Sequence, residues 1–157
     1  MERFNKLIAD EVYLSYSEKN TACEKTRIFC RHDSEHFLDT ARIGYILALE
    51  EGKKFSKEVI YTCAFLHDIG RWQQYTEGIP HEKASHQLAM PLLQKYGFTL
   101  QEQKDILEGI LGHRKGAEKG LGKLMYKSDK LSRRCYSCRA ESQCDWSPKK
   151  KNKTLIY

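Results

Sequence analysis

The stretch that decides the fold is AFLHDIGR, residues 64–71, in which an apolar run ends in a His–Asp pair followed by Ile-Gly. Apolar residues recur at helical spacing upstream of this pair, beginning after Ser56, a residue type typical of helix N-caps. The run is therefore predicted to be a buried helix. Because His67 and Asp68 are costly to bury without polar partners, the rest of the chain must supply those partners.

Helical periodicity dominates the remaining sequence, and strand patterns are almost absent. The apolar patterns cover residues 34–51, 56–70, 82–96, 100–112 and 118–134. The first twenty residues are a further candidate helix, and Pro91 predicts a kink or a break in the third pattern. We expect a single compact all-α domain of five to seven helices over residues 1–134. A short, irregular, Cys-containing and basic segment, residues 135–157, would pack on this domain or trail from it.

Composition indicates one soluble domain. The 157 residues are 40% hydrophobic and 31% charged, which is typical of a globular chain able to bury a core of its own. No apolar run approaches the ~20 residues that span a bilayer, so no membrane partner is expected. The first sixteen residues lack a signal-peptide pattern, which predicts a cytoplasmic protein.

The positive charge is concentrated near the end of the chain. The net charge is +6, and residues 133–157 hold seven Lys and Arg against two Asp and Glu. A short lysine run such as PKKKNK, residues 148–153, is typical of a solvated chain end. Nucleic-acid binding is therefore not expected.

Several polar residues stand where the apolar stripe of a helix would favour a hydrophobic one. His36 opens the stripe of residues 34–51, His113 ends that of residues 100–112, and Asp129 follows the apolar positions of residues 118–134. One such histidine is typical of a hydrogen-bonded core residue. Four helices that each direct a His or Asp inward favour a shared metal ion instead, because imidazole and carboxylate together suit Zn, Mn, Fe or Ni.

The order of these residues resembles that of the HD-domain phosphohydrolase superfamily. The matching positions are His36 in EHFLDTA, His67 and Asp68 in LHDIG, and Asp129 in KSDKLSR. The resemblance covers roughly residues 30–133 and implies an HD-domain fold in which these four residues hold a divalent metal, one of Fe, Mn, Zn, Ni, Co or Mg.

Two further histidines distinguish two-metal from one-metal members of that superfamily. The candidates here are His81 in IPHEKAS and His113 in LGHRKG, with His86 as an alternative to His81. If both candidates are ligands, Asp68 is the natural bridging carboxylate.

The same resemblance offers catalytic candidates. HDSEH, residues 32–36, is similar to the HNxxH element of cyclic nucleotide phosphodiesterases, which implies that His32 is a general acid. The alternative is an exposed histidine near a helix start. Basic residues beside the motifs suit phosphate, and Arg71 and Arg114 are favoured because each directly follows a ligand motif. Arg31, Lys115 and Lys130 are weaker candidates.

The function implied is hydrolysis of a phosphoester or phosphoanhydride bond in a small phosphorylated substrate, most simply a nucleotide, by a metal-activated hydroxide. The candidate substrates range from mononucleotides and cyclic nucleotides to dinucleoside polyphosphates and guanosine tetraphosphate. The alternative is a non-catalytic or regulatory nucleotide-binding HD module.

The cysteines suggest a possible second site. Cys135, Cys138 and Cys144 lie close in sequence and, with Cys23 or Cys30 as a fourth ligand, suit a structural zinc or an iron–sulfur cluster. Such a site would fasten the C-terminal segment to the N-terminal region. Reduced cysteines packed under Trp146 are the alternative.

Overall fold

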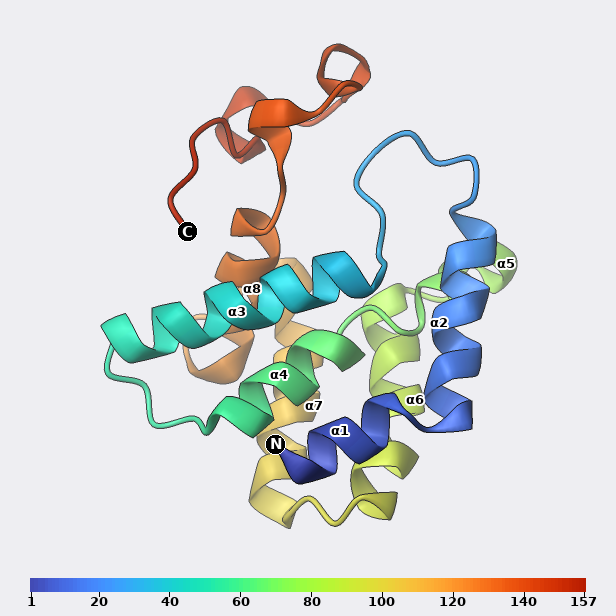
Figure 1. Cartoon of the computed structure of the whole chain (residues 1–157), viewed down its shortest axis with the longest axis vertical. Helices are drawn as coiled ribbons and strands as arrows, with labels where there is room; N and C mark the ends of the chain where they lie inside the picture. Colours follow the sequence, from blue (N-terminus) through green and yellow to red (C-terminus); the bar gives the residue numbers. More distant parts are fainter.

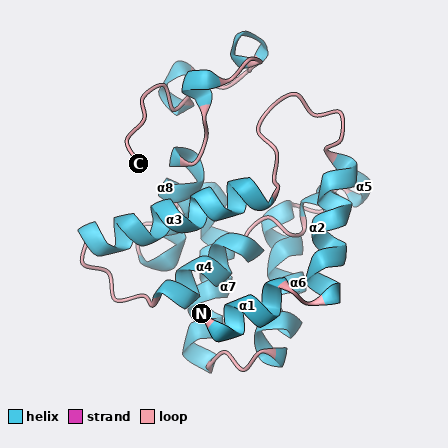
Figure 2. Cartoon of the chain, viewed as in Figure 1, coloured by secondary structure: helices cyan, strands magenta, loops and turns pink.

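Eight α-helices form the body of the protein in this computed structural model, which describes the backbone of residues 1–157 and every side chain except that of Lys115 (Figure 1). The α-helices are α1 (Glu2–Ile8), α2 (Glu11–Cys23), α3 (Ser34–Glu50), α4 (Lys57–Leu66), α5 (Arg71–Glu77), α6 (His81–Lys95), α7 (Leu100–Lys115) and α8 (Gly120–Leu131). Three short 3-10 helices follow at Cys135–Ser137, Glu141–Gln143 and Pro148–Lys150. The described chain contains no strand, which confirms the all-α prediction (Figure 2).

The helix count is one above the predicted range because the N-terminal residues form two helices instead of one. The chain turns at Asp10, whose side chain caps α2 by accepting a hydrogen bond from the Val12 amide at 2.8 Å. The short helix α5, which follows the HDIG turn, was not predicted either. Within the described residues, no helix is long and apolar enough to cross a membrane.

Helix α6 continues through Pro91, so the predicted break is wrong. A proline inside a helix removes one amide donor and frees the carbonyl four residues earlier. Here both Pro91 and Gln87 are exposed, and water can therefore satisfy the freed carbonyl. The helix tolerates the proline because the lost bond faces solvent.

The predicted cap at Ser56 is confirmed, and a second cap begins the helix predicted over residues 100–112. Ser56 caps α4 by accepting from the Val59 amide at 3.2 Å, and Thr99 forms a capping box with Glu102 at the start of α7. Helix α7 extends past Gly112, where the apolar pattern stops, and ends at Lys115.

The core lies where α3, α4, α7 and α8 pack together. Its fully buried side chains include Phe37, Ile60, Leu66, Ile110 and Met125. Helices α7 and α8 approach closely because glycines face each other: a Cβ atom on Gly112 would lie 2.8 Å from the Gly122 Cα. This close packing brings the end of α7 against the start of α8 and fixes the direction in which both helices run.

The C-terminal segment, residues 135–157, lies at the end of the molecule that also holds the loop between α2 and α3 (Figure 1). It is attached to the body, because Arg134 donates to Asp39 of α3 at 2.7 Å and Asn152 donates to the Leu131 carbonyl at 2.9 Å. Tyr157 reaches Glu50 at 3.0 Å. The segment therefore packs on the helices instead of trailing into solvent.

Candidate metal centre

Residues at or near the ends of five helices, together with one residue of the HDIG turn, lie in the same interior region. His36 lies in the first turn of α3, His67 caps the end of α4, and Asp68 follows it in the HDIG turn. His81 begins α6, while His113 and Asp129 lie near the ends of α7 and α8. Two groups have ligand atoms within 4.8 Å of one another: His36, His67 and Asp129, and His67, Asp68 and His113. Residues spread over most of the chain thus meet in one place.

Asp68 is the centre of this arrangement. Its Oδ2 lies 3.2 Å from the Nε2 of His67, and its Oδ1 lies 3.4 Å from His81 Nε2 and 3.6 Å from His113 Nε2. The side chain is almost fully buried. A buried carboxylate with imidazoles on both oxygens is suited to a metal site.

Two of the histidines are held by backbone carbonyls one helical turn earlier. The Nδ1–H of His67 donates to the Ala64 carbonyl at 2.6 Å, and that of His113 donates to the Ile110 carbonyl at 2.5 Å. With Nδ1 carrying the proton, Nε2 presents a lone pair to the interior. Metal-binding histidines are typically held in this way.

The other two histidines, His81 and His36, are held by side chains, which likewise leaves Nε2 free of a proton. The Nδ1–H of His81 donates to Gln74 Oε1 at 2.6 Å. Because the Ser132 hydroxyl donates to the Asp129 carbonyl at 2.9 Å, it accepts from His36 Nδ1 at 3.2 Å. The Nε2 of His36 then faces Asp129 Oδ1 at 3.6 Å.

This donor set fits a divalent cation. His81 Nε2 and His113 Nε2 lie 3.1 Å apart with a lone pair on each, an arrangement that is repulsive unless a cation lies between them. His36 Nε2, His67 Nε2 and Asp68 Oδ1 are buried and have no hydrogen-bond partner. Buried polar atoms are rarely left unpaired, so these atoms are suited to metal coordination.

Electrostatics favours the metal-binding protonation states at most of these positions. Burial lowers the pKa of His36 and of His81 to about 3, so both imidazoles are neutral at pH 7. Burial opposes ionisation of Asp129, but Lys130 and Arg133 outweigh it and hold the pKa of that carboxyl well below its usual range. Two neutral imidazoles and an ionised carboxylate can therefore coordinate a cation without first losing protons.

His67 and Asp68 behave as a tightly coupled pair. Burial opposes ionisation of Asp68, yet the neighbouring imidazoles of His67 and His32 hold the pKa of this carboxyl well below its usual range. Burial also opposes protonation of His67, but the carboxylates of Asp68 and Asp129 outweigh it and raise the pKa of the imidazole. Binding of a metal ion at His67 would displace this proton.

The HDIG turn needs glycine for a close approach. A Cβ atom on Gly70 would lie 2.5 Å from the Ser85 amide nitrogen and 2.7 Å from the Ala84 Cβ. The Gly70 amide also donates to Ser85 Oγ at 2.9 Å. The glycine thus lets α6, which begins with His81, pack directly on the turn that carries Asp68.

Asn20 of α2 supports the same turn and was not found from the sequence. Its fully buried side chain donates to the Asp68 carbonyl at 2.9 Å and accepts from the Trp72 amide at 2.8 Å. A single asparagine in a helix without a clear apolar stripe gives no distinguishing signal.

His32 is held beside the cluster by Glu24, a second residue that the sequence did not indicate. Glu24 is buried and accepts from His32 Nδ1 at 2.5 Å, from the His32 amide at 2.7 Å and from the Tyr75 hydroxyl at 2.6 Å. These bonds outweigh burial and lower the pKa of Glu24 to about 2. His32 Nε2 lies 3.7 Å from Asp68 Oδ2, so the interpretation of His32 as an exposed residue is wrong.

Arg71 and Arg114, the two favoured arginines, lie at the cluster but differ in their contacts and exposure. Arg71 Nη1 is 3.0 Å from His81 Nδ1. Burial opposes the charge of the Arg71 guanidinium, but the Asp68 carboxylate outweighs burial and raises the pKa of this guanidinium. Arg114 is half-exposed and donates to Glu82 at 3.0 Å. Among the weaker candidates, Lys130 pairs with Asp129, Arg31 donates to backbone carbonyls of the α2–α3 loop, and the side chain of Lys115 lies outside the described residues.

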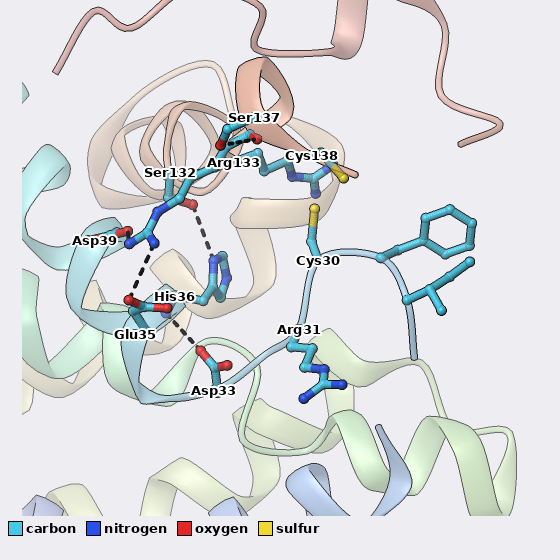
Figure 3. Close-up of a pocket in the computed structure, with 13 residues that line it drawn as sticks. Cys30, Arg31, Asp33, Glu35, His36, Asp39, Ser132, Arg133, Ser137 and Cys138 are labelled. Atoms are coloured by element: carbon cyan, nitrogen blue, oxygen red, sulfur yellow. Dashed lines mark hydrogen bonds and ion pairs between the residues drawn. The ribbon is translucent and has the colours of Figure 1, made fainter. Parts of the chain in front are cut away.

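The His–Asp cluster opens into a cavity of about 490 Å³ whose wall includes His32, Arg71 and Arg114. This volume is within the range of small-molecule sites. A neighbouring pocket of about 230 Å³ lies on the other side of His36, between α3 and the start of the C-terminal segment (Figure 3). In Figure 3, Cys30 and Cys138 face each other across this pocket, and Ser132 contacts His36.

The structure also places the alternative histidine and the cysteines. Neither His81 nor His86 is in the two ligand groups of the described residues. The two histidines differ in their contacts: His81 Nε2 lies 3.4 Å from Asp68 Oδ1 and 3.1 Å from His113 Nε2, whereas His86 is half-buried on α6. Cys135 and Cys144 line the larger cavity and Cys138 the smaller one. Among the described residues, no three cysteine sulfurs come within 4.8 Å of one another, and the second metal site stays a prediction.

Comparison with known proteins agrees with this geometry. The family model of the HD domain matches residues 33–141. The chain therefore belongs to the HD domain family, the superfamily of metal-dependent phosphohydrolases that its His and Asp pattern resembles. An uncharacterized protein of Clostridium beijerinckii (strain ATCC 51743 / NCIMB 8052) is 45% identical over 157 residues, covering the whole of both chains. No solved structure matches significantly.

Proposed function

We propose that this protein hydrolyses a phosphoester or phosphoanhydride bond of a small phosphorylated substrate, a nucleotide, with divalent metal ions as cofactors. The observation that carries the proposal is the set of four imidazole Nε2 atoms directed at two buried carboxylates. Two of these nitrogens, in His36 and His67, and the Oδ1 of Asp68 have no hydrogen-bond partner among the described residues. A metal site needs such unpaired ligand atoms, whereas a packed core does not.

The ligands divide into two overlapping groups. His36, His67 and Asp129 form one group and would hold one ion, while His67, Asp68 and His113 form the other. If a second ion is bound, Asp68 and His113 would hold it together with His81, whose Nε2 lies 3.4 Å from Asp68 Oδ1, and Asp68 would be the residue that bridges the two ions. Ions in these positions supply a hydroxide near neutral pH and withdraw charge from the phosphoryl oxygens.

The chain's own residues supply the remaining groups. Arg71 lines the cavity beside the His–Asp cluster, where its guanidinium can donate two hydrogen bonds to a phosphate. Arg114 lies further out and can release Glu82 to contact a substrate. His32 would give a proton to the leaving oxygen from Nε2, while the Glu24 carboxylate would hold its Nδ1–H and stabilise the protonated ring.

The test begins with the metal content of protein purified without air, followed by hydrolysis assays on a nucleotide panel with Mn, Fe, Co, Ni, Zn or Mg added. The variants His67→Ala and Asp68→Ala should lose bound metal and all hydrolysis, since each removes a buried ligand. His86→Ala is the matched control, because that imidazole lies outside the cluster, and it should keep both. Full activity in either ligand variant contradicts the proposal. Tight nucleotide binding without turnover under every metal would identify a binding module instead.

A further inference from the structure

The C-terminal segment, residues 135–157, forms part of the wall of the catalytic cavity. The cavity of about 490 Å³ that contains Asp68 and Asp129 is also lined by Trp146, Lys149 and Lys150. The side chains of Lys149 and Lys150 are exposed, as expected for a solvated chain end, but they also line this cavity, which the sequence did not indicate. Figure 1 shows the segment at the end of the molecule where α3 and α8 meet it.

Specific contacts hold the segment in this position. The guanidinium of Arg133 lies 3.5 Å from the centre of the Trp146 ring, a cation–π contact between the segment and the end of α8. Asn152 donates to the carbonyls of Leu131 at 2.9 Å and Arg133 at 3.1 Å. Lys151 is nearly buried and pairs with Glu141 at 2.8 Å, which closes the segment on itself.

The cavity wall is strongly positive. Eight basic residues line it against three acidic ones, Asp68, Asp129 and Asp145. The basic residues are Arg27, Arg71, Arg114, Lys130, Arg133, Lys149, Lys150 and Lys151. Most of the chain's excess charge thus faces one cavity.

Among the described residues, three of these cations form no ion pair with a carboxylate: Arg71, which contacts His81 beside the cluster, and Lys149 and Lys150. Lys130 and Arg133 pair with Asp129, and Arg114 pairs with Glu82. In the described part of the chain, Lys149 and Lys150 form no ion pair; Lys150 only faces the Trp146 ring at 5.8 Å. Both side chains are exposed at the outer end of the cavity, so their charge is available to a ligand.

We propose that Lys149 and Lys150 are specificity-determining residues that select substrates with a polyphosphate chain. This inference rests on the proposed function: the phosphoryl group that reacts lies at the His–Asp cluster, and the further phosphates of the chain lie against the two lysines. A single phosphate at the cluster would already be matched by Arg71 and by the metal ions that the ligand residues would hold. Unpaired cations further along the cavity add binding energy only for a substrate that carries further anionic groups there.

The test compares Lys149→Gln/Lys150→Gln with Lys153→Gln as a matched control. Lys153 belongs to the same basic run, but it pairs with Glu141 at 2.6 Å and does not line the cavity. Calorimetry measures the affinity of each metal-loaded protein for inorganic tripolyphosphate and for orthophosphate. Tripolyphosphate also binds divalent ions, and the comparison at one fixed metal concentration cancels that contribution.

We expect the double variant to lose roughly thirtyfold in tripolyphosphate affinity, because two contacts between opposite charges are lost and each is worth about 1 kcal/mol in water. Its orthophosphate affinity should match that of the control, and its KM should rise for a nucleoside triphosphate but not for a nucleoside monophosphate. Equal tripolyphosphate affinity in both variants, or an equal loss for both anions, overturns the inference. Failure of the proposed function would look different: the selective loss of binding would remain while no substrate was hydrolysed.

Discussion

Replacing Gly70 by alanine tests whether close packing at the HDIG turn assembles the metal centre. The new Cβ atom would lie 2.5 Å from the Ser85 amide nitrogen and 2.7 Å from the carbonyl carbon of Ala84. Both are backbone atoms of α6 and cannot rotate away. Helix α6 must therefore retreat by about 1 Å to reach ordinary contact distance.

The expected cost follows from this overlap. Forcing one extra methyl group into a packed interior costs about 1–3 kcal/mol. For a chain of this size, a loss of about 2 kcal/mol lowers the melting temperature by roughly 4–8 °C. Because His81 is the first residue of α6, the same retreat moves its Nε2 away from Asp68. The variant should therefore bind less metal at the half of the centre formed by His81 and His113.

Thermal unfolding followed by circular dichroism measures the first effect, and elemental analysis of the purified protein measures the second. Gly44→Ala is the matched control, because its Cβ atom would meet the flexible end of Met125 at 3.1 Å instead of backbone. That variant also gains about 1 kcal/mol in helix propensity and should be near neutral. A Gly70→Ala protein with wild-type melting temperature and metal content would refute the packing argument.

Three further predictions follow from the same geometry. Glu24→Gln should lower kcat by about tenfold to hundredfold at unchanged KM and metal content, since it weakens the hold on the proton-donating imidazole; an unchanged kcat would contradict that role. Arg71→Gln should lower kcat/KM by about tenfold or more, and Arg114→Gln by less, because the second guanidinium is half-exposed and paired; equal losses in steady-state assays would contradict this ranking. In metal-free protein, burial lowers the pKa of His36 and His81 to about 3. As pH falls below about 6.5, these two imidazoles therefore take up protons in the unfolded chain while they stay neutral in the folded protein. The free energy of unfolding should then decrease by up to about 1.4 kcal/mol per pH unit for each imidazole below pH 6.5. Urea unfolding in a chelating buffer between pH 7 and pH 5 checks this, and a constant midpoint would contradict it.

The sequence was sufficient for the helices that carry the ligands. His36, His67, His113 and Asp129 interrupt apolar stripes, and a polar residue on a buried stripe is visible without a structure. The caps at Ser56 and Thr99 set the starts of two of these helices for the same local reason.

The supporting residues were not accessible in this way. Glu24 and Asn20 reach the cluster from a helix more than forty residues before the HDIG turn, and neither interrupts a regular pattern. The position of Lys149 and Lys150 depends on tertiary contacts at Trp146, which a lysine run cannot reveal. Composition alone assigned these lysines to a solvated end.

The buried side-chain amide of Asn20 limits how far the chain can be shortened from its N-terminus without losing contacts at the HDIG turn. The HD domain match begins at residue 33, yet the peptide groups on both sides of the HDIG turn are clamped by a side chain from α2. A chain trimmed to the matched boundaries would leave those groups without a partner inside the protein. Helix α2 is thus as much a part of the framework of the His–Asp cluster as the segment that the HD domain model matches.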